Sequence, residues 1–297
     1  MYVIFGASGN AGRVAATRLR EAGKAVRAVV RTLDQGRTLA AFGCEVVVAD
    51  LTDRQSVQRA IDGAHAVQML CPVPSLHMNP GQLMRDMIDV AAAALHANPP
   101  PHVLAISDYG AELDIDTGIT TLFHLQERRL KAAVPRLTLL RSAEHMQNWA
   151  RVFPVALATG VLPSFHHPLS KLFPLVSALD VGEAAAALLL QGPPDDATRI
   201  VSIEGPERMC AHDVARTLST VAGREITARE LPRYQWTSTL LRAGLSENHA
   251  QLITELYDVH NAGHIDVEAH AGERRIGSIT LANAFDTLLA RSALGVR

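Results

Sequence analysis

Several features that define particular classes of protein are missing from this chain of 297 residues. No apolar run approaches the roughly 20 residues of a membrane-spanning helix. The formal net charge is −2, which gives no excess of basic groups for nucleic acid or an anionic membrane. The three cysteines, Cys44, Cys71 and Cys210, lie far apart without the spacing of a metal site, which is typical of a reducing cytosol.

Signals for secretion, metal binding and hydrolysis are also missing. The first predicted strand begins at residue 2, so we expect no signal or transit peptide and a cytoplasmic location. His166 and His167 are neighbours in a proline-rich stretch, and His260 and His264 lack the glutamate of an HExxH motif, so no metal site is predicted. No GxSxG motif occurs, which argues against hydrolase chemistry.

The first residues predict a strand, a glycine-rich turn and a helix. Residues 2–5 form an apolar run typical of a buried parallel strand, and residues 13–22 carry an apolar face at helical spacing. Such a unit binds a pyrophosphate, because glycine lets the backbone come close and the helix N-terminus offers free N–H groups. The residues predicted to contact a dinucleotide here are Gly6, Ser8, Gly9, Asn10, Ala11 and Gly12.

The glycine spacing differs from the usual dinucleotide fingerprint GxGxxG, because Ala7 stands where its first glycine would be. The pattern is GxxGxxG, with Gly6, Gly9 and Gly12. A tight structural turn is the alternative interpretation, but it accounts for one glycine and not for three. The strand before the glycines and the helix after them therefore favour a nucleotide site.

The ends of the second and third predicted strands indicate the type of cofactor. An NAD enzyme usually carries Asp or Glu about 20 residues past the glycines, for the ribose 2′-hydroxyl. This chain has Arg31 there, and a guanidinium suits a 2′-phosphate, so NADP(H) is favoured over NAD(H); an ordinary solvated arginine is the alternative. Asp50 and Leu51 follow the third strand and are predicted to contact the cofactor. Asp50 is predicted either to meet the adenine amino group or to serve only the local turn.

The loop after the fourth predicted strand is expected to border the nicotinamide half of the site. In an open parallel sheet, ligands lie beyond the carboxyl ends of the strands. The strand covers residues 66–70, and the loop begins with Leu70, Cys71 and Pro72. These three residues are therefore predicted to contact the cofactor.

Two polar residues follow the fifth predicted strand, residues 103–106. Ser107 ends the strand beside the cofactor and is predicted to contact its ribose. Tyr109 is predicted either to donate a hydrogen bond to a substrate carbonyl or to pack on the loop as a half-buried aromatic residue.

Strand and helix alternate six times before the rhythm breaks after Asn148. This alternation predicts an α/β fold with a Rossmann-like, doubly wound parallel sheet over residues 1–150. Four prolines then punctuate an irregular stretch, and mostly helical patterns follow. We expect residues 151–297 to form a smaller α+β lobe that covers the cleft, with some segments returning to the Rossmann core.

Several short stretches occur in a characteristic order along nearly the whole chain. They are Gly6–Gly12, Val26–Arg31, Val48–Asp53, Thr138–Arg141 leading to Met146–Asn148, Asp180–Ala184 and Ile203–Pro206. In this order and spacing they resemble the NmrA-like family of atypical short-chain dehydrogenases. The resemblance implies a Rossmann domain, a smaller carboxyl-terminal lobe and an NADP-type cofactor in the cleft. Family members are either NAD(P)H-dependent reductases or cofactor-binding redox sensors.

The chain departs from ordinary short-chain dehydrogenases in its catalytic residues. Those enzymes use Tyr-x-x-x-Lys, in which the lysine lowers the tyrosine pKa so that the phenol can pass a proton. None of the four tyrosines here is followed by lysine four residues later. In NmrA-like reductases a lysine or histidine on the sixth helix faces the nicotinamide, and the resemblance places His124 near that position. A polar residue at the rim of the helix is the alternative for His124.

These observations support two main hypotheses. One is an NAD(P)H-dependent oxidoreductase that reduces a small quinone-like or conjugated acceptor, since the nicotinamide carries the chemistry and such an acceptor is protonated afterwards from water. The other is a non-catalytic NADP(H) sensor that regulates a partner protein. A nucleoside-sugar epimerase is disfavoured by the missing Tyr-x-x-x-Lys. The expected partner is a small molecule, not nucleic acid or membrane, with a protein partner only for a sensor.

Overall fold

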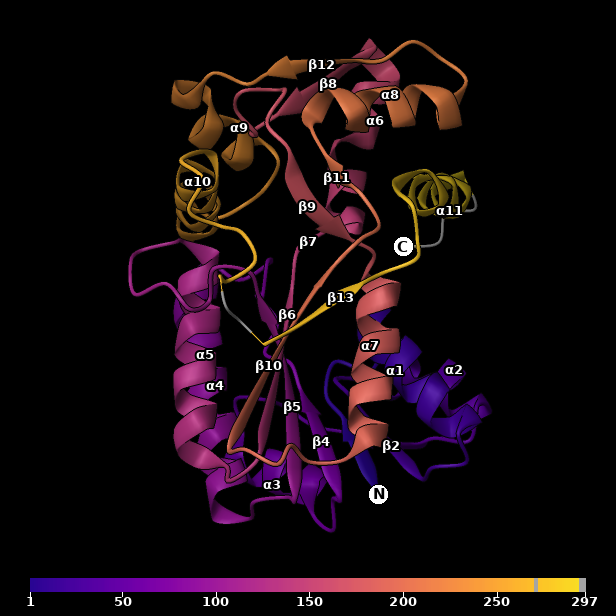
Figure 1. The fold of residues 1–297 in the computed structure, drawn as a ribbon, viewed down its shortest axis with the longest axis vertical. Helices are drawn as coiled ribbons and strands as arrows, with labels where there is room; N and C mark the ends of the chain where they lie inside the picture. Colours follow the sequence, from indigo (N-terminus) through magenta and orange to yellow (C-terminus); the bar gives the residue numbers. More distant parts are fainter. Residues whose placement is uncertain (270–271, 294–297) are drawn as a thin grey trace.

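An eight-stranded sheet forms the centre of the protein (Figure 1). The computed structural model describes residues 1–269 and 272–293. The strand order is β13-β10-β6-β5-β4-β1-β2-β3, and every neighbouring pair is parallel. The strands are β1 (Tyr2–Ile4), β2 (Val26–Val30), β3 (Glu45–Val48), β4 (Ala66–Met69), β5 (His102–Asp108), β6 (Leu137–Ser142), β10 (Thr198–Glu204) and β13 (Glu273–Ile276). This order confirms the predicted doubly wound parallel sheet.

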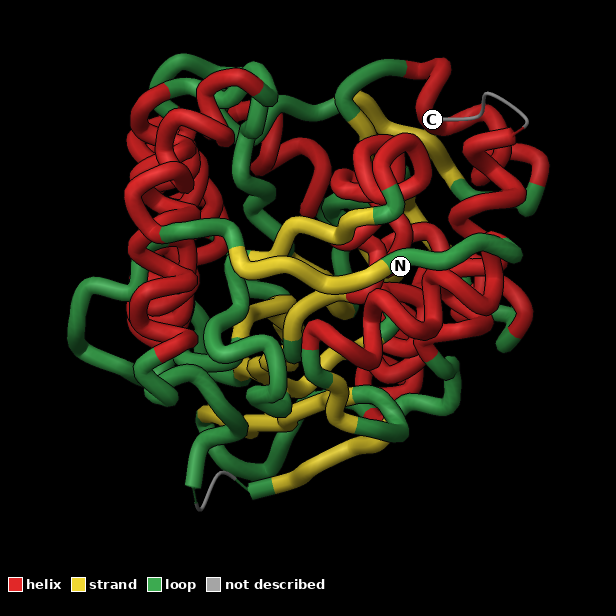
Figure 2. The backbone as a smooth tube through the Cα atoms, turned by 90° about the horizontal axis from the view of Figure 1, so that it is seen from above, coloured by secondary structure: helices red, strands yellow, loops and turns green. Residues whose placement is uncertain are grey.

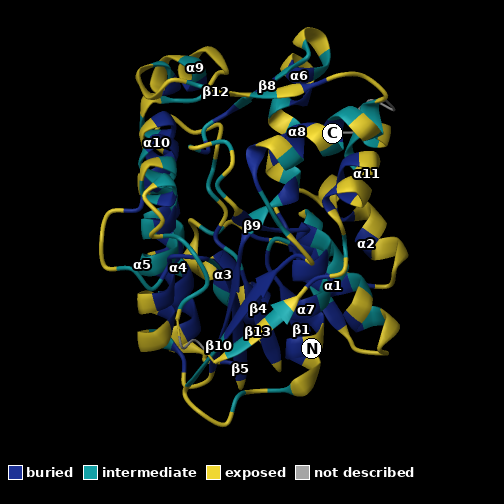
Figure 3. Cartoon of the chain, turned by 45° about the horizontal axis from the view of Figure 1, so that its top comes forward, coloured by how far each residue is buried: buried dark blue, intermediate teal, exposed yellow. Residues whose placement is uncertain are grey.

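Helices cover both faces of this sheet (Figure 2). One face is covered by α1 (Asn10–Glu21), α2 (Arg37–Ala41) and α7 (Ala178–Gln191), and the other by α3 (Arg54–Ile61), α4 (Pro80–Ala97) and α5 (Ile119–Ala133). Alternate residues of each strand point to opposite faces. Ile4 of β1 therefore packs in one apolar core and Val3 in the other. The central strands β1, β4 and β6 are buried throughout, and β5 is buried up to Ser107 (Figure 3), which explains their largely apolar sequences.

The 3-10 segment η1 (Leu33–Gly36) follows β2, and the remaining elements, including the short 3-10 segment η3 (Arg233–Gln235), lie beyond the carboxyl end of β6 (Figure 1). The others are β7 (Glu144–His145), the 3-10 segment η2 (Met146–Val152), α6 (Phe153–Thr159), β8 (Val161–Ser164), β9 (Phe173–Val176), β11 (Arg208–Met209), α8 (Ala211–Ala222), β12 (Thr227–Glu230), α9 (Trp236–Arg242), α10 (Glu247–Asn261) and α11 (Leu281–Ala293). They contain two small sheets, β11-β9-β7 and β12-β8. A separate apolar core, which includes Trp149, Phe153 and Phe285, holds many of them together.

Segments after residue 150 also belong to the main sheet and its helical cover. Strand β10 pairs with β6, β13 pairs with β10, and α7 packs along α1. The boundary near residue 150 between two domains stays a prediction. Among the described residues, no helix combines the length and the apolar character needed to cross a membrane.

Gly182 allows α1 and α7 to pack closely against each other. A Cβ atom at this position would lie 2.4 Å from the carbonyl oxygen of Ala11 and 2.7 Å from the Cβ of Val14. Ala11 belongs to the first turn of α1, so this contact also holds the end of the helix that carries the glycine turn.

Replacing Gly182 with alanine should destabilise the protein by about 1–3 kcal/mol, because the added methyl group overpacks the contact between the two helices. Urea denaturation followed by circular dichroism measures this change. Leu190→Ala in the same helix is the control, since Leu190 is 40% exposed and its loss should change stability by about 0.5 kcal/mol or less. Equal stabilities for Gly182→Ala and the wild type would contradict the close packing.

Candidate active site

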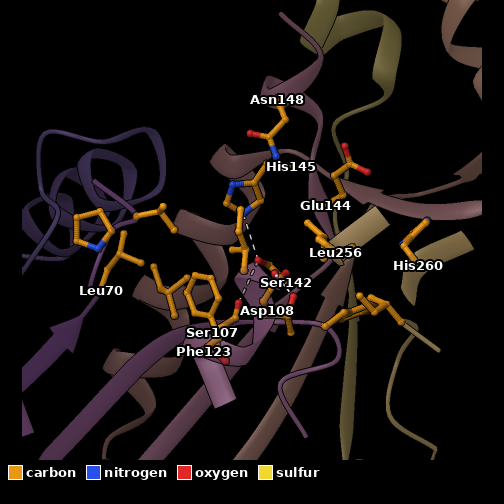
Figure 4. A pocket seen from close by; sticks show the side chains of 18 of the residues that line it. Leu70, Ser107, Asp108, Phe123, Ser142, Glu144, His145, Asn148, Leu256 and His260 are labelled. Carbon is orange, nitrogen blue, oxygen red and sulfur yellow. Dashed lines mark hydrogen bonds between the residues drawn. The ribbon is translucent and has the colours of Figure 1, made fainter. Parts of the chain in front are cut away.

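A cavity of about 380 Å³ lies beyond the carboxyl ends of β4, β5 and β6, and we call it the first cavity. It is bordered by Ala11 in α1, by Leu70 and Pro72 after β4, and by Ser107 in β5. The strands β1 and β4 are neighbours in the sheet. From β1 the chain continues to β2 on one side, and from β4 it continues to β5 on the opposite side. Ligands of doubly wound sheets bind at such a switch point. The structure therefore brings four of the predicted cofactor residues together at the expected place, and Figure 4 shows two of them, Leu70 and Ser107, at the cavity.

The glycine turn between β1 and α1 has the geometry of an anion site. Gly6 has a φ of 72°, and the N–H of Gly9 donates to its carbonyl oxygen at 3.0 Å. A Cβ on Gly12 would lie 2.2 Å from that same oxygen, so only glycine fits there. Gly9 caps α1 without a side-chain hydrogen bond, and the first turn holds no acidic residue. The N-terminus of α1 is thus open to a negatively charged group.

The residues predicted for the adenosine half lie at the ends of β2 and β3. Arg31 is exposed directly after β2, and its backbone N–H donates to Gln35 Oε1 at 3.2 Å. The Asp50 carboxylate accepts from the N–H and the hydroxyl of Thr52, both at 2.8 Å. This is the local turn role that the sequence left open for Asp50. Leu51 packs at the edge of the apolar core between the sheet and α3–α5.

A buried ion pair lies directly beneath Ser107. The Ser107 hydroxyl donates to Glu127 Oε1 at 2.7 Å, and the Arg141 guanidinium donates to both Glu127 oxygens at 2.8 and 2.7 Å. The Glu127 and Arg141 side chains are each 2% exposed. Burial would raise the pKa of Glu127, but the hydrogen bonds and charge of Arg141 lower it below its ordinary value. The hydroxyl proton of Ser107 is therefore donated to Glu127. The oxygen lone pairs stay free to accept a hydrogen bond from a ligand in the cavity.

Gln126 fixes the loop after β4 to the end of β5. Its Nε2 donates to the carbonyl oxygen of Ile106 at 2.9 Å, and its Oε1 accepts from the N–H of Cys71 at 3.2 Å. Cys71 itself is fully buried and is not among the residues that line the cavity, and burial raises the pKa of its thiol to about 12. Any contact of Cys71 with a cofactor would therefore involve its backbone.

Tyr109 forms part of the cavity wall but is 2% exposed. Its hydroxyl donates to Glu204 Oε2 in β10 at 3.4 Å. Burial and the Glu204 charge raise the pKa of the phenol. This geometry agrees with the packing alternative for Tyr109, because its hydroxyl already has a partner within the protein.

A second cavity of about 370 Å³ lies beside the first, between η2, β8, α9 and α10. Its wall is largely apolar and includes Trp149, Phe165, Leu240, Ile253 and Tyr257. Both cavities share wall residues from β7, η2 and α10, among them Glu144, Arg151, His249 and Leu256. The sequence patterns did not single out these residues, because they come from short or irregular segments that meet only in the folded chain.

Comparison with known proteins identifies the family. Residues 2–275 match the model of the NmrA-like family. The chain belongs to this family. An NAD(P)H azoreductase of Xenophilus azovorans is 24% identical over 261 residues, which cover 86% of each chain.

Solved structures share the same fold. An NADPH-dependent quinone oxidoreductase from Escherichia coli, complexed with NADPH, has a TM-score of 0.81 at 19% identity, covering 97% of this chain and all of that one. A triphenylmethane reductase from Citrobacter sp., complexed with NADP(H), has a TM-score of 0.79 at 18% identity, with the same coverage.

In this NmrA-like chain His124 does not line either cavity. Its Nδ1 lies 2.9 Å from the carbonyl oxygen of Ala111, and its Nε2 lies 3.8 Å from Asp114 Oδ1. Phe123 lines the first cavity instead (Figure 4). Successive residues of a helix point about 100° apart, so a difference of one position turns the imidazole away from the site. The role of His124 stays a prediction, and in this structure its imidazole lies outside both cavities.

The described part of the chain holds no group of three or more His, Cys, Asp or Glu side chains arranged to bind a metal ion. His166 instead contacts Glu144, with Nε2 at 3.0 Å from Oε2, and stacks on Phe173 at a ring distance of 3.8 Å.

Replacing Glu127 with glutamine should destabilise the NmrA-like chain by about 1–3 kcal/mol at pH 7, because the buried Arg141 loses the carboxylate that accepts two of its hydrogen bonds and keeps only Glu112 and Glu268 as charged partners. The folded-state pKa of Glu127 is lowered, so this stabilisation is present above the unfolded pKa and is lost as the pH falls through the folded value. Urea denaturation at neutral and acidic pH measures both effects.

The control for this substitution is Glu21→Gln. Glu21 pairs with Arg18 at the surface, where both side chains are 51% exposed, so little change is expected. Similar losses of stability in the two variants would show that the buried ion pair contributes no more than the surface pair.

Proposed function

We propose that the protein is an NADP(H)-dependent oxidoreductase that reduces a small quinone-like or conjugated acceptor. The observation that carries this proposal is the first cavity, which reaches from the first turn of α1 across the carboxyl ends of β4 and β5. The two cavities each have a volume in the range of small-molecule sites. The related azoreductase and the structurally similar quinone and triphenylmethane reductases support the same class of reaction.

The residues present fit an NADP-type cofactor. The close approach allowed by Gly6 and Gly12, with the uncapped N-terminus of α1, suits the pyrophosphate. Arg31 would meet the 2′-phosphate, and Leu70, Pro72 and Ser107 would surround the nicotinamide. When bound, the reduced cofactor supplies a hydride. The protein's part is to orient the two reactants and to exclude water with apolar walls.

The second cavity favours an enzyme over a non-catalytic sensor. A sensor needs room only for the cofactor, whereas a reductase needs a separate space for its acceptor. The apolar and aromatic wall of the second cavity suits the rings of a conjugated acceptor. The missing Tyr-x-x-x-Lys pair agrees with this class, because a quinone needs no strong general acid.

Purified protein should oxidise NADPH in the presence of quinones or dyes, followed by the loss of NADPH absorbance. Ala243→Trp should lower kcat/KM for a multi-ring acceptor by about tenfold or more, because Ala243 lines the second cavity. Its NADPH affinity should stay that of the wild type. Ala97→Trp, at an exposed position outside both cavities, is the matched control. NADPH binding without turnover on a broad panel would contradict the enzyme proposal.

Replacing Arg31 with alanine should weaken NADPH binding by about ten- to hundredfold, the value of one charge-assisted hydrogen bond of about 1.5–3 kcal/mol. NADH binding should change little, and titration calorimetry with both cofactors measures the difference. Arg37→Ala is the control, because the Arg37 guanidinium already pairs with Asp34 at 2.8 Å. An equal loss of affinity for both cofactors in Arg31→Ala would refute a 2′-phosphate contact.

A further inference from the structure

We propose that the carboxyl group of Asp108 donates the proton to an acceptor that takes up hydride in the first cavity. This proposal rests on the proposed function. Asp108 is the last residue of β5 and lines the cavity, directly after Ser107. Figure 4 shows it in the group of side chains that also includes Ser107 and Ser142. It therefore lies where β5 meets the predicted nicotinamide position.

The contacts of Asp108 leave its proton available. Its Oδ2 accepts a hydrogen bond from the hydroxyl of Thr120 in α5 at 3.1 Å. Among the described residues, Asp108 has no ion pair with a lysine, arginine or histidine. The buried Arg141 nearby is already paired with Glu127, Glu268 and Glu112. No cation therefore holds Asp108 in its ionised form.

The surroundings of Asp108 favour its protonated form. Burial raises its pKa most, the charges of Glu144 and Glu112 raise it further, and the Thr120 hydroxyl lowers it. The resulting pKa is about 7. At neutral pH a large share of the molecules therefore carries a proton on this carboxyl, close to the optimum for a general acid.

The other titratable groups of the cavity are less suited to this step. Burial lowers the pKa of His145 in β7 and of His249 and His260 in α10, the last to about 4, so all three are neutral at pH 7. Burial raises the pKa of Tyr257, and Tyr109 is bonded to Glu204.

The two remaining charged groups of the wall are Glu144 and Arg151. Burial raises the pKa of Glu144, but His166 lowers it to a net value below the ordinary one, so Glu144 is ionised. Asp108 is left as the carboxyl that both carries a proton and releases it readily.

The chemistry separates acceptors that need a proton from those that do not. With an azo dye, the hydride and its electron pair pass from the reduced nicotinamide to one nitrogen. The π electrons move to the other nitrogen, which takes the proton from Asp108. The products are the reduced dye, oxidised cofactor and the Asp108 carboxylate, which regains a proton from water. A triarylmethyl cation takes only the hydride at its central carbon and needs no proton.

The experiment compares Asp108→Asn with the wild type on one acceptor of each kind, methyl red as the azo dye and crystal violet as the cation. At pH 6 asparagine resembles the protonated carboxyl in shape and charge but does not give up a proton. The kcat/KM for methyl red should fall about 10²-fold more than that for crystal violet, which is the lower end of general-acid effects. Equal losses for the two dyes would overturn the proposal.

The pH profile gives a second readout. For methyl red the wild-type kcat/KM should fall as the pH rises through about 7, because the acid form of Asp108 is needed. This falling part of the pH profile, the alkaline limb, should be absent in Asp108→Asn. Thr120→Val removes the hydrogen bond that favours the carboxylate, so the limb should move to higher pH. Thr121→Val is the control, because Thr121 contacts Asp116 and Thr117 instead, and the limb should not move.

The outcomes separate the two proposals. Wild-type protein that binds NADPH but reduces neither dye and no quinone of the broad panel would overturn the proposed function and the role of Asp108 with it. Turnover of both dyes with an unchanged profile in Thr120→Val and Asp108→Asn would overturn only the role of Asp108. If Asp108→Asn does not fold, the direction of the Thr120→Val shift decides, and a limb that does not move counts against Asp108.

Discussion

The buried ion pair between Glu127 and Arg141 is the interaction on which the site depends. It joins α5 to β6, and through the Ser107 hydroxyl it also holds the end of β5. The neighbouring Gln126 extends the same connection to the loop after β4. Gln126 and Glu127, adjacent polar residues of α5, thus fix the strand ends that border the first cavity. A charge pair so well buried is tolerated because its hydrogen bonds are nearly all satisfied, and that requirement fixes where three strand ends lie relative to one another.

Local patterns in the sequence were enough for the Rossmann-like half of the fold. Strands buried on both faces read as short apolar runs, and the helices between them carry one apolar face, so type and order follow from periodicity. The patterns failed where pairing is non-local. Residues 199–203 read correctly as a short strand, but nothing in them tells that β10 lies between β6 and β13. The short helix α6 and the elements β13 and α11 were not predicted, since each depends on packing against distant segments.

The same contrast between local and non-local structure separates the predicted part of the site from the rest. The glycine turn is contiguous in sequence and has a fixed backbone requirement, so Gly6 and Gly12 could be found without a structure. The cavity walls come from β4, β5, β7, η2 and α10, which meet only after folding. A helical position is also sensitive to an error of one residue, as His124 and Phe123 show. Asp108 lay between two residues that the sequence did single out, and only its burial and its neighbours give it a distinctive chemistry.

The two halves of the cleft have separate origins in the chain. The glycine turn, the proposed cradle for a dinucleotide, follows β1 directly, whereas the roof of the cleft is built from β7, η2, β8, α9 and α10, outside the main sheet. Mutations in the roof can therefore accumulate without disturbing the cradle. Under the proposed function, such a division would let the choice of acceptor change during evolution while the cofactor stays the same.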